Sequence, residues 1–242
     1  YKRQIEGNKI KQFGKVTANP MWNQDFPQEV FENDPYNRFN FGIPPSKKSS
    51  DWGWIQHMFA SLRDNGKLVV VIDTGVVTRG SGSSGTDREK EIRKKFVEAD
   101  LIEAVILLTD NLFYNTPAAG NIIVVNKAKK HPGEILLVNA SKEFVRGRPK
   151  NYLAEQNISK ILKVYQNWEE IEGFSKIITI EDARANDYNL SPSRYISIDE
   201  GEELLPVGDI LYELSIIEKE KEEINAELSN IFSKMGYEGW IK

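Results

Sequence analysis

The chain of 242 residues contains no cysteine and only two histidines. Without cysteine it cannot form a disulfide scaffold, a cysteine-ligated zinc site or a catalytic thiol. No apolar run is long enough to cross a membrane, and no signal peptide opens the sequence. These absences predict a cytoplasmic protein that uses no metal and has no membrane partner, and its length allows one large domain or two small ones.

The sequence also lacks an excess of positive charge. Its 32 basic and 36 acidic residues give a net charge of −4 at pH 7. A domain that binds DNA on its own usually has a basic excess or a basic face. If DNA is a ligand, we therefore expect another subunit to supply most of the affinity.

Short apolar runs alternate with amphipathic segments through most of the chain. We predict strands at 15–18, 68–72, 102–108, 121–126, 135–138 and 177–180, and helices at 52–62, 86–98 and 158–168. Gly66 is expected to end the first of these helices. The alternation predicts a parallel α/β sheet with right-handed crossovers. Residues 23–50 form a long loop with one helical turn near residues 28–31, and loops of that length are usually functional.

The last part of the chain changes character. Apolar residues recur at helical spacing across residues 209–235, with the charged run 218–223 between them. This pattern predicts one long amphipathic helix with charges that pair at i,i+4. Such a helix packs on its own domain or binds a helix of another subunit.

Asn19-Pro20-Met21-Trp22 follows the first predicted strand and carries the clearest chemical signal. The side-chain oxygen of Asn19 and the carbonyl of Pro20 can both accept a hydrogen bond from one NH₂ group. Pro20 has a fixed φ, which stiffens the turn. Trp22 offers a flat ring on which a base can stack.

Further blocks follow this tetrapeptide in a fixed order. They are Asn40–Pro45, Asp51–Met58, Leu62–Ile72, Gly75–Gly80, Glu91–Lys94, Leu101–Ile106, Asn111–Thr116, Ile122–Lys127 and Asn186–Ser191. Together with the Asn-Pro turn, the series closely resembles the modification subunit of type I restriction–modification systems, an adenine-N6 DNA methyltransferase family. The resemblance extends from about residue 16 to about residue 198.

The resemblance implies a fold and a set of site residues. The fold would be α/β, the C-terminal half of a Rossmann-like S-adenosylmethionine-dependent methyltransferase sheet with a helical C-terminal extension. Asn19, Pro20 and Trp22 would be catalytic, and Met21, Phe113 and Tyr114 would line the target-base pocket. Met21 stands where the family pattern has a second proline, so this turn is less restrained.

The resemblance also implies an assembly. A methyl group would pass from S-adenosylmethionine to adenine N6 in a complex with specificity and restriction subunits, and DNA would be bound through that complex. We expect residues 1–131 to belong to the catalytic domain, 132–203 to a family-specific extension and 204–242 to a helical tail that contacts another subunit.

The donor-binding turn of such enzymes is missing ahead of Asn19. Residues 1–18 contain no Gly-rich strand-to-helix turn, so we expect a C-terminal portion that is inactive alone. The strand near Val16 would then have an exposed edge, which predicts a homodimer or another covering contact.

Two other functions stay open, and two polar segments are interpreted as loops without a catalytic role. The chain could be a non-catalytic assembly module of the same complex, or a methyltransferase for another amine or amide, such as a glutamine side chain or an RNA base. The Gly/Ser run 80–85 is typical of a flexible linker. The basic run Arg146–Lys150 could contact phosphate, but a solvated loop is the preferred interpretation.

Overall fold

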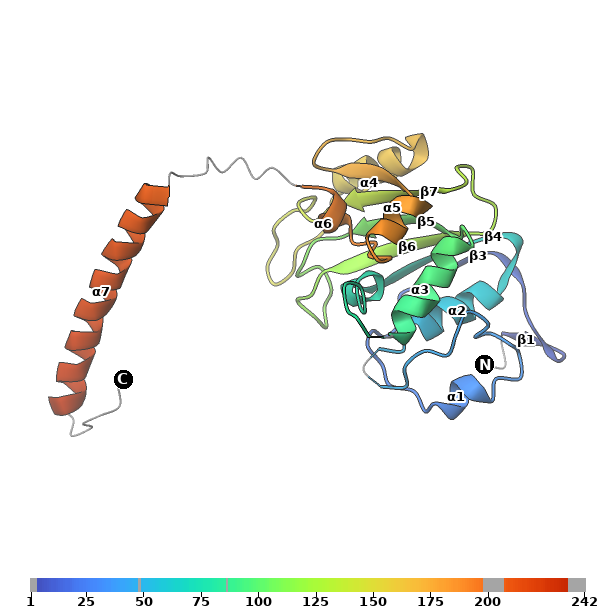
Figure 1. Cartoon of the computed structure of the whole chain (residues 1–242), viewed down its shortest axis with the longest axis horizontal. Coiled ribbons are helices and arrows are strands. Elements are labelled where there is room, and N and C mark those ends of the chain that lie inside the picture. The colour runs from blue at the N-terminus through green and yellow to red at the C-terminus, as the bar shows by residue number, and fades with distance from the viewer. Residues whose placement is uncertain (1–3, 48, 86, 198–206, 235–242) are drawn as a thin grey trace. The chain divides into compact units, whose positions relative to one another are not determined.

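The computed structural model describes residues 4–47, 49–85, 87–197 and 207–234 (Figure 1). Tyr1–Ile198 form one compact unit and Asp199–Lys242 a second. The described part of the second unit is helix α7 (Val207–Lys234), which matches the long helix predicted for residues 209–235 but begins at residue 207. No described helix is both long and apolar enough to cross a membrane.

The first unit alternates strands and helices along most of its length. Its strands are β1 (Ile5–Glu6), β2 (Lys9–Ile10), β3 (Phe13–Ala18), β4 (Leu62–Asp73), β5 (Ile102–Leu107), β6 (Gly120–Asn126), β7 (Glu134–Asn139) and β8 (Ser175–Thr179). Its helices are α1 (Glu29–Glu32), α2 (Asp51–Ala60), the 3₁₀ turn η1 (Thr74–Val77), α3 (Arg88–Glu98), α4 (Glu155–Asn167), α5 (Ile180–Ala185) and α6 (Pro192–Tyr195).

Six strands form one mixed sheet in the order β3-β4-β6-β5-β7-β8. The α/β class is confirmed, but the prediction of an all-parallel sheet is wrong. β3 runs parallel to β4 and β5 parallel to β7, whereas β6 is antiparallel to β4 and β5. β8 is antiparallel to β7. Residues 108–119 between β5 and β6 contain no helix, and a parallel return would need a longer crossover.

Helices cover both faces of the sheet. On one face α2, α3 and α5 pack on β4, β5 and β6 around a core that includes Ile55, Phe96 and Val105. On the other face α4 places Ile161 and Val164 on β5, β6 and β7. The central strands are therefore apolar on both sides, as their continuous hydrophobic runs predict.

Gly66 does not end a helix. α2 ends at Ala60, where the Ser61 N–H donates to Met58 O at 3.0 Å and the Ser61 hydroxyl donates to His57 O at 3.2 Å. Gly66 lies inside β4, and its carbonyl accepts from the Lys127 N–H at 3.1 Å. Residues 63–66 resemble a turn in sequence, but they belong to a long strand, with residues 63–65 exposed and Gly66 buried.

β3 lies at one edge of the sheet and pairs only with β4 among the described strands. Phe13 on this strand is 43% exposed. The exposed strand edge expected near Val16 is therefore present in this chain. A homodimer or another contact that covers it stays a prediction.

The segment predicted as a family-specific extension continues the same sheet. Within 132–203 the structure describes β7, β8 and the helices α4, α5 and α6. β7 pairs with β5, so the sheet itself runs across residue 131. The division into 1–131, 132–203 and 204–242 stays a prediction.

Phe96 on α3 joins the long loop and α2 to the sheet. Its ring centroid lies 4.2 Å from that of Phe41, 5.1 Å from that of Trp52 and 5.3 Å from that of Phe59, and Phe96 is fully buried. Phe96→Ala is expected to lower the free energy of unfolding by about 3–5 kcal/mol, because the cavity cannot collapse among rigid rings. Urea unfolding measures the loss.

The half-exposed Phe13 supplies the matched control. Phe13→Ala should cost about 1 kcal/mol or less, because much of its ring already contacts solvent. Equal losses for the two substitutions would contradict the role given to Phe96.

Candidate functional site

Four strands direct their carboxyl ends to one edge of the sheet. β4 and β5 are both antiparallel to β6, so they run in the same direction, and β3 and β7 run with them. The segments that follow these strands therefore meet at that edge. In open α/β sheets, ligands bind at the carboxyl ends of the strands.

A cavity of about 730 Å³, here called the site cavity, lies at this edge. Its lining includes every site residue predicted from the sequence: Asn19, Pro20, Met21, Trp22, Phe113 and Tyr114. Asp73 at the end of β4 also lines it. Segments distant in sequence thus form one concave surface, while the chemical roles of these residues stay predictions.

The Trp22 ring is held rigidly at the wall of the site cavity. Its Nε1–H donates to Val71 O at 3.2 Å, and its ring meets Phe113 edge to face with centroids 4.7 Å apart. A Cβ on Gly120 would lie 2.8 Å from Trp22 and 2.9 Å from Phe113. Glycine at position 120 therefore makes room for this aromatic pair.

The acceptors of the Asn-Pro turn are open. Asn19 is exposed, and neither its side-chain amide nor the Pro20 carbonyl hydrogen-bonds to any described residue. Tyr114, 89% exposed, and Met21, 65% exposed, stand at the rim. The arrangement can therefore accept two hydrogen bonds from one amine beside a fixed aromatic wall.

Arg79 lies behind the turn and binds three carboxylates from three elements. Its guanidinium is 2.8 Å from Asp51 of α2 and 2.8 Å from Asp73 of β4, and Nε pairs with Glu89 of α3. The Arg79 Nη1 group also donates to Asn23 Oδ1 at 3.3 Å. We call Arg79 with Asp51, Asp73 and Glu89 the Arg79 cluster.

The Arg79 cluster reaches the Asn-Pro turn through Asn23. The backbone N–H of Asn23 donates to Asp51 Oδ1 at 2.9 Å, and Asp51 is completely buried. Arg93, also completely buried, donates to Arg79 O at 2.9 Å. The turn is therefore tied to α2 and α3 one residue after Trp22.

Burial dominates the electrostatics of the Arg79 cluster. It raises the pKa of Asp51 and of Glu89, although hydrogen bonds and the Arg79 charge oppose the rise. Burial alone would lower the pKa of Arg79, but Glu89, Asp51 and Asp73 outweigh it and raise that pKa. Burial also lowers the pKa of Arg93 to about 10.

The sequence predicted none of the Arg79 cluster. Asp51 and Arg79 belong to two blocks of the resemblance, Asp51–Met58 and Gly75–Gly80, and neither block indicates an ion pair. No sequence pattern joins these four residues, which are spread over residues 51–89.

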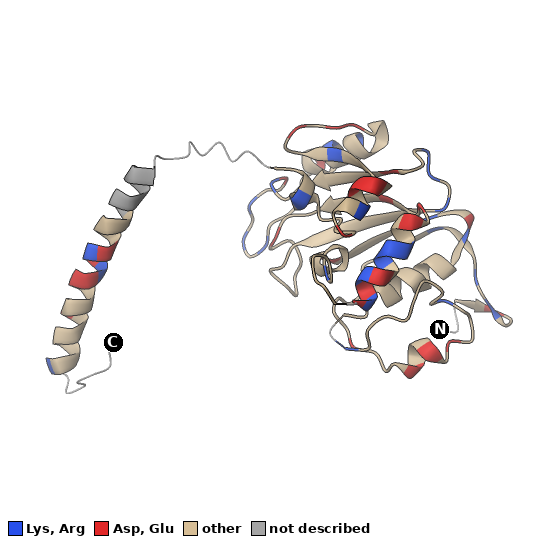
Figure 2. Cartoon of the chain, in the orientation of Figure 1, with Lys and Arg blue, Asp and Glu red and all other residues tan. Residues whose placement is uncertain are grey.

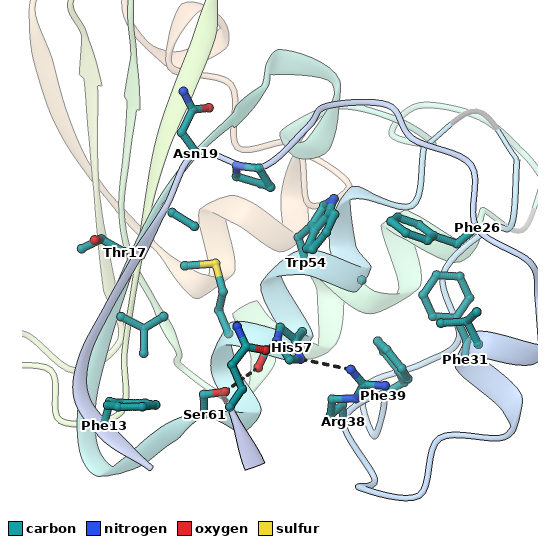
Figure 3. Close-up of a pocket in the computed structure, with 17 residues that line it drawn as sticks. Phe13, Thr17, Asn19, Phe26, Phe31, Arg38, Phe39, Trp54, His57 and Ser61 are labelled. Atoms are coloured by element: carbon teal, nitrogen blue, oxygen red, sulfur yellow. Dashed lines mark hydrogen bonds between the residues drawn. The ribbon is translucent and has the colours of Figure 1, made fainter. Parts of the chain in front are cut away.

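A second cavity of about 520 Å³, the apolar cavity, lies between β3, α2 and the long loop (Figure 3). Its lining contains five large aromatic residues: Phe13, Phe26, Phe31, Phe39 and Trp54. Asn19 and Pro20 also line it, so the Asn-Pro turn borders both cavities.

Polar groups hold one wall of the apolar cavity in place. Arg38 pairs with Asp34 at 2.7 Å, and its Nη1 group lies 3.2 Å from Nδ1 of His57. Burial lowers the pKa of His57. Its Nε2 lies 2.9 Å from Gln4 Oε1. In the described residues no group of three or more His, Cys, Asp or Glu is placed to hold a metal ion.

Comparison with known proteins gives a consistent family. A model of the N-6 DNA Methylase family matches residues 2–203. The type I restriction enzyme MjaVII methylase subunit of Methanocaldococcus jannaschii is 43% identical over 218 residues, which are 86% of this chain and 36% of that protein. The HindI methylase subunit of Haemophilus influenzae is 32% identical, covering 94% of this chain and 53% of that protein.

Solved structures agree. The type I restriction–modification methyltransferase subunit from Streptococcus thermophilus aligns with a TM-score of 0.70 and 30% identity, over 80% of this chain and 39% of that one. The EcoKI M protein aligns with a TM-score of 0.55 and 12% identity, over 76% of this chain and 43% of that one, which shows the fold alone. The chain thus spans between about a third and a half of the curated relatives described here.

Removal of Arg79 is expected to destabilise the fold in a pH-dependent way. Arg79→Met leaves Asp51 and Glu89 buried without a counter-ion, which typically costs about 3–5 kcal/mol. Both carboxyls already have raised pKa values, so the folded state binds more protons than the unfolded state above about pH 4. Without Arg79 these pKa values rise further, so the carboxyls are protonated in the folded variant at pH 5 and must lose their protons, at a cost in stability, as the pH rises to 8. The loss of unfolding free energy caused by the substitution should therefore be larger at pH 8 than at pH 5.

Chemical denaturation at the two pH values measures the difference. Arg88→Met removes an exposed arginine from the start of α3 and should change stability by about 0.5 kcal/mol or less. A loss for Arg79→Met that is the same at pH 5 and pH 8 would argue against buried, uncompensated carboxylates.

Proposed function

Because the chain belongs to the N-6 DNA methylase family, we propose that it forms the target-base side of a type I adenine-N6 DNA methyltransferase. The supporting observation is the site cavity, where Asn19, Pro20 and Trp22 after β3 face Phe113 and Tyr114 after β5. A flipped adenine needs this combination of amine acceptors and aromatic walls.

In this proposal the Asn-Pro turn positions and activates the amine. Asn19 Oδ1 and Pro20 O accept the two N–H bonds of adenine N6, which favours a more tetrahedral and nucleophilic nitrogen. The gain comes from orientation and fixed dipoles rather than from a titrating base. Trp22 stacks on the base, and the hydrogen bond from its Nε1–H to Val71 O fixes the position of the ring.

S-adenosylmethionine is the methyl donor that we propose for the whole enzyme. The described residues ahead of Asn19 form the β1–β2 hairpin and β3, without a strand, Gly-rich turn and helix in succession. They do not fit a donor-binding turn. The residues of this chain therefore serve the acceptor side, and titration of S-adenosylmethionine into the isolated chain should give no heat of specific binding.

We also propose that α7 joins this chain to the specificity subunit, in a complex that includes a restriction subunit. Five of its exposed apolar residues and one lysine recur at alternate steps of three and four: Leu214, Ile217, Lys221, Ile224, Leu228 and Ile231. Exposed Ile216 lies beside this series. This is the spacing of a coiled-coil seam. Glu220 and Glu227 flank it, so two copies of α7 would oppose like charges.

The alternatives remain distinguishable. A non-catalytic assembly module would keep α7 and the fold but would not depend on the Asn-Pro turn. A methyltransferase for another amine or amide would use the same turn but would leave no N6-methyladenine in DNA. Mass spectrometry of digested DNA and of the protein fraction separates these products.

Asn19→Ala, made in the complete enzyme with its partner subunits, is expected to slow methyl transfer about 10²–10³-fold. It removes one preorganised acceptor from the amine without a change in the fold. Transfer of labelled methyl groups from S-adenosylmethionine to DNA measures the rate. Asn65→Ala, an exposed amide at the start of β4, is the matched control and should keep the wild-type rate.

Trp22→Ala tests the stacking surface in the same assay. Base stacking on an aromatic ring is worth about 1–3 kcal/mol, so transfer should fall roughly 10–100-fold. An unchanged rate for either Asn19→Ala or Trp22→Ala would remove that residue from the proposed site.

Lys221→Ile tests the seam of α7. A peptide of residues 207–234 with this change has an unbroken apolar stripe and should associate with itself, so its helicity should rise with concentration. The wild-type peptide should show no such rise, because Lys221 and the flanking glutamates oppose pairing. Circular dichroism at several concentrations measures both, and equal association of the two peptides would contradict the role of Lys221.

A further inference from the structure

The loop after β7 is the most basic segment at the site edge. Val145 and Tyr152 pair across it through hydrogen bonds of 2.9 and 3.1 Å, which close residues 146–151 into a compact turn. A Cβ on Gly147 would lie 2.2 Å from Lys150 O, so this turn requires glycine there. We call residues 145–152 the basic loop; Figure 2 shows its Lys and Arg in blue.

The basic loop is fastened to the loop that carries Phe113 and Tyr114. Lys150 Nζ donates to Asn111 Oδ1 at 3.0 Å and to Thr116 O at 3.1 Å. The Asn151 N–H donates to Asn111 O at 3.0 Å, and Asn111 Nδ2 donates to Pro149 O at 3.3 Å. Both loops follow strands that run in the same direction, so they lie at the same edge as the site cavity (Figure 1).

Two arginines of the basic loop have no polar partner. Arg146 and Arg148 are exposed, and neither makes a hydrogen bond or ion pair with any described residue. Arg38, Arg79 and Arg184 are, by contrast, bound to carboxylates. The neighbouring acid Glu143 is already paired with Lys160 of α4, so it does not neutralise the basic loop.

Exposed aromatic rings accompany these charges. Tyr114 is 89% exposed on the adjoining loop, and Tyr152 is 53% exposed at the end of the basic loop. Guanidinium groups interleaved with open aromatic rings are the usual surface for a nucleic-acid strand, with phosphates on the cations and bases or sugars on the rings.

We propose that the basic loop binds the phosphodiester backbone of the strand that carries the target base, with Arg146 and Arg148 on phosphates beside the flipped nucleotide. This inference rests on the proposed function of the site cavity. It favours the phosphate contact over the solvated loop for residues 146–150. It also places a local cationic contact on a chain whose net charge is −4.

The test is the salt dependence of DNA binding by the full chain without methyl donor. A labelled 24-base-pair duplex is titrated with wild type, with Arg146→Gln/Arg148→Gln and with Lys95→Gln/Lys130→Gln. Lys95 and Lys130 are exposed and lie at the opposite edge of the sheet. Lys95 is in the last turn of α3, and Lys130 is in the connection between β6 and β7. Each double variant removes two positive charges.

Loss of two phosphate contacts should reduce the slope of log K against log salt by about 2 for the Arg146/Arg148 variant, with weaker binding at every salt concentration. The Lys95/Lys130 variant should keep the wild-type slope. Equal slopes for the two variants, or no measurable binding of the duplex by the full chain, would overturn the proposal. So would inorganic phosphate at millimolar concentration displacing the duplex as effectively as unlabelled DNA.

The outcomes separate this inference from the proposed function. A complete enzyme that methylates adenine while the two double variants bind DNA alike refutes only the basic loop. An enzyme that transfers no methyl group to DNA, while the Arg146/Arg148 variant alone loses salt dependence, refutes the methyltransferase assignment and leaves the phosphate contact in place.

Discussion

One guanidinium group holds together the part of the molecule on which the site depends. Arg79 binds carboxylates from α2, β4 and α3, and two of those carboxylates are completely or almost completely buried. Buried charges are tolerated only when they are paired and hydrogen-bonded. The three elements therefore have one mutual arrangement that satisfies these charges, and Asn23 passes that arrangement to the Asn-Pro turn. The turn has Met21 where a second proline is usual in the family pattern, so its backbone is less restrained. The contacts of Asn23 with Asp51 and Arg79 restrain it instead.

The antiparallel strand β6 is the second constraint. It lets β5 continue directly into residues 108–119 without a covering helix, so Phe113 and Tyr114 lie open at the carboxyl edge. Strand β7 then continues the parallel set and brings the basic loop beside them. The aromatic wall of the site cavity and the cationic basic loop thus come from two connections at one edge of the sheet, while the long loop (residues 23–50) borders both cavities.

Much of this could be predicted from the sequence, for physical reasons. Long apolar runs identified β4, β5, β6 and β7, because strands buried on both faces are largely apolar. The resemblance assigned the Asn-Pro turn and Phe113–Tyr114 to one pocket, and the structure places both segments in the lining of the site cavity. The direction of β6 could not be predicted, since periodicity carries no information about pairing. The Arg79 cluster was invisible because its carboxylates are scattered over residues 51–89 and resemble solvent-facing charges. Gly66 was misassigned because turn-like residues also occur at the exposed start of a strand.

Asn19 and Pro20 border two cavities at once. A ligand of the apolar cavity that favours one position of the Pro20 ring would also change the affinity of the site cavity for the adenine that we propose it binds. The base must change the affinity of the apolar cavity by the same factor. A contact made along β3 by another polypeptide segment would therefore act on more than the stability of the sheet edge. Acting through Asn19 and Pro20, it would also change the affinity of the site cavity for the proposed amine.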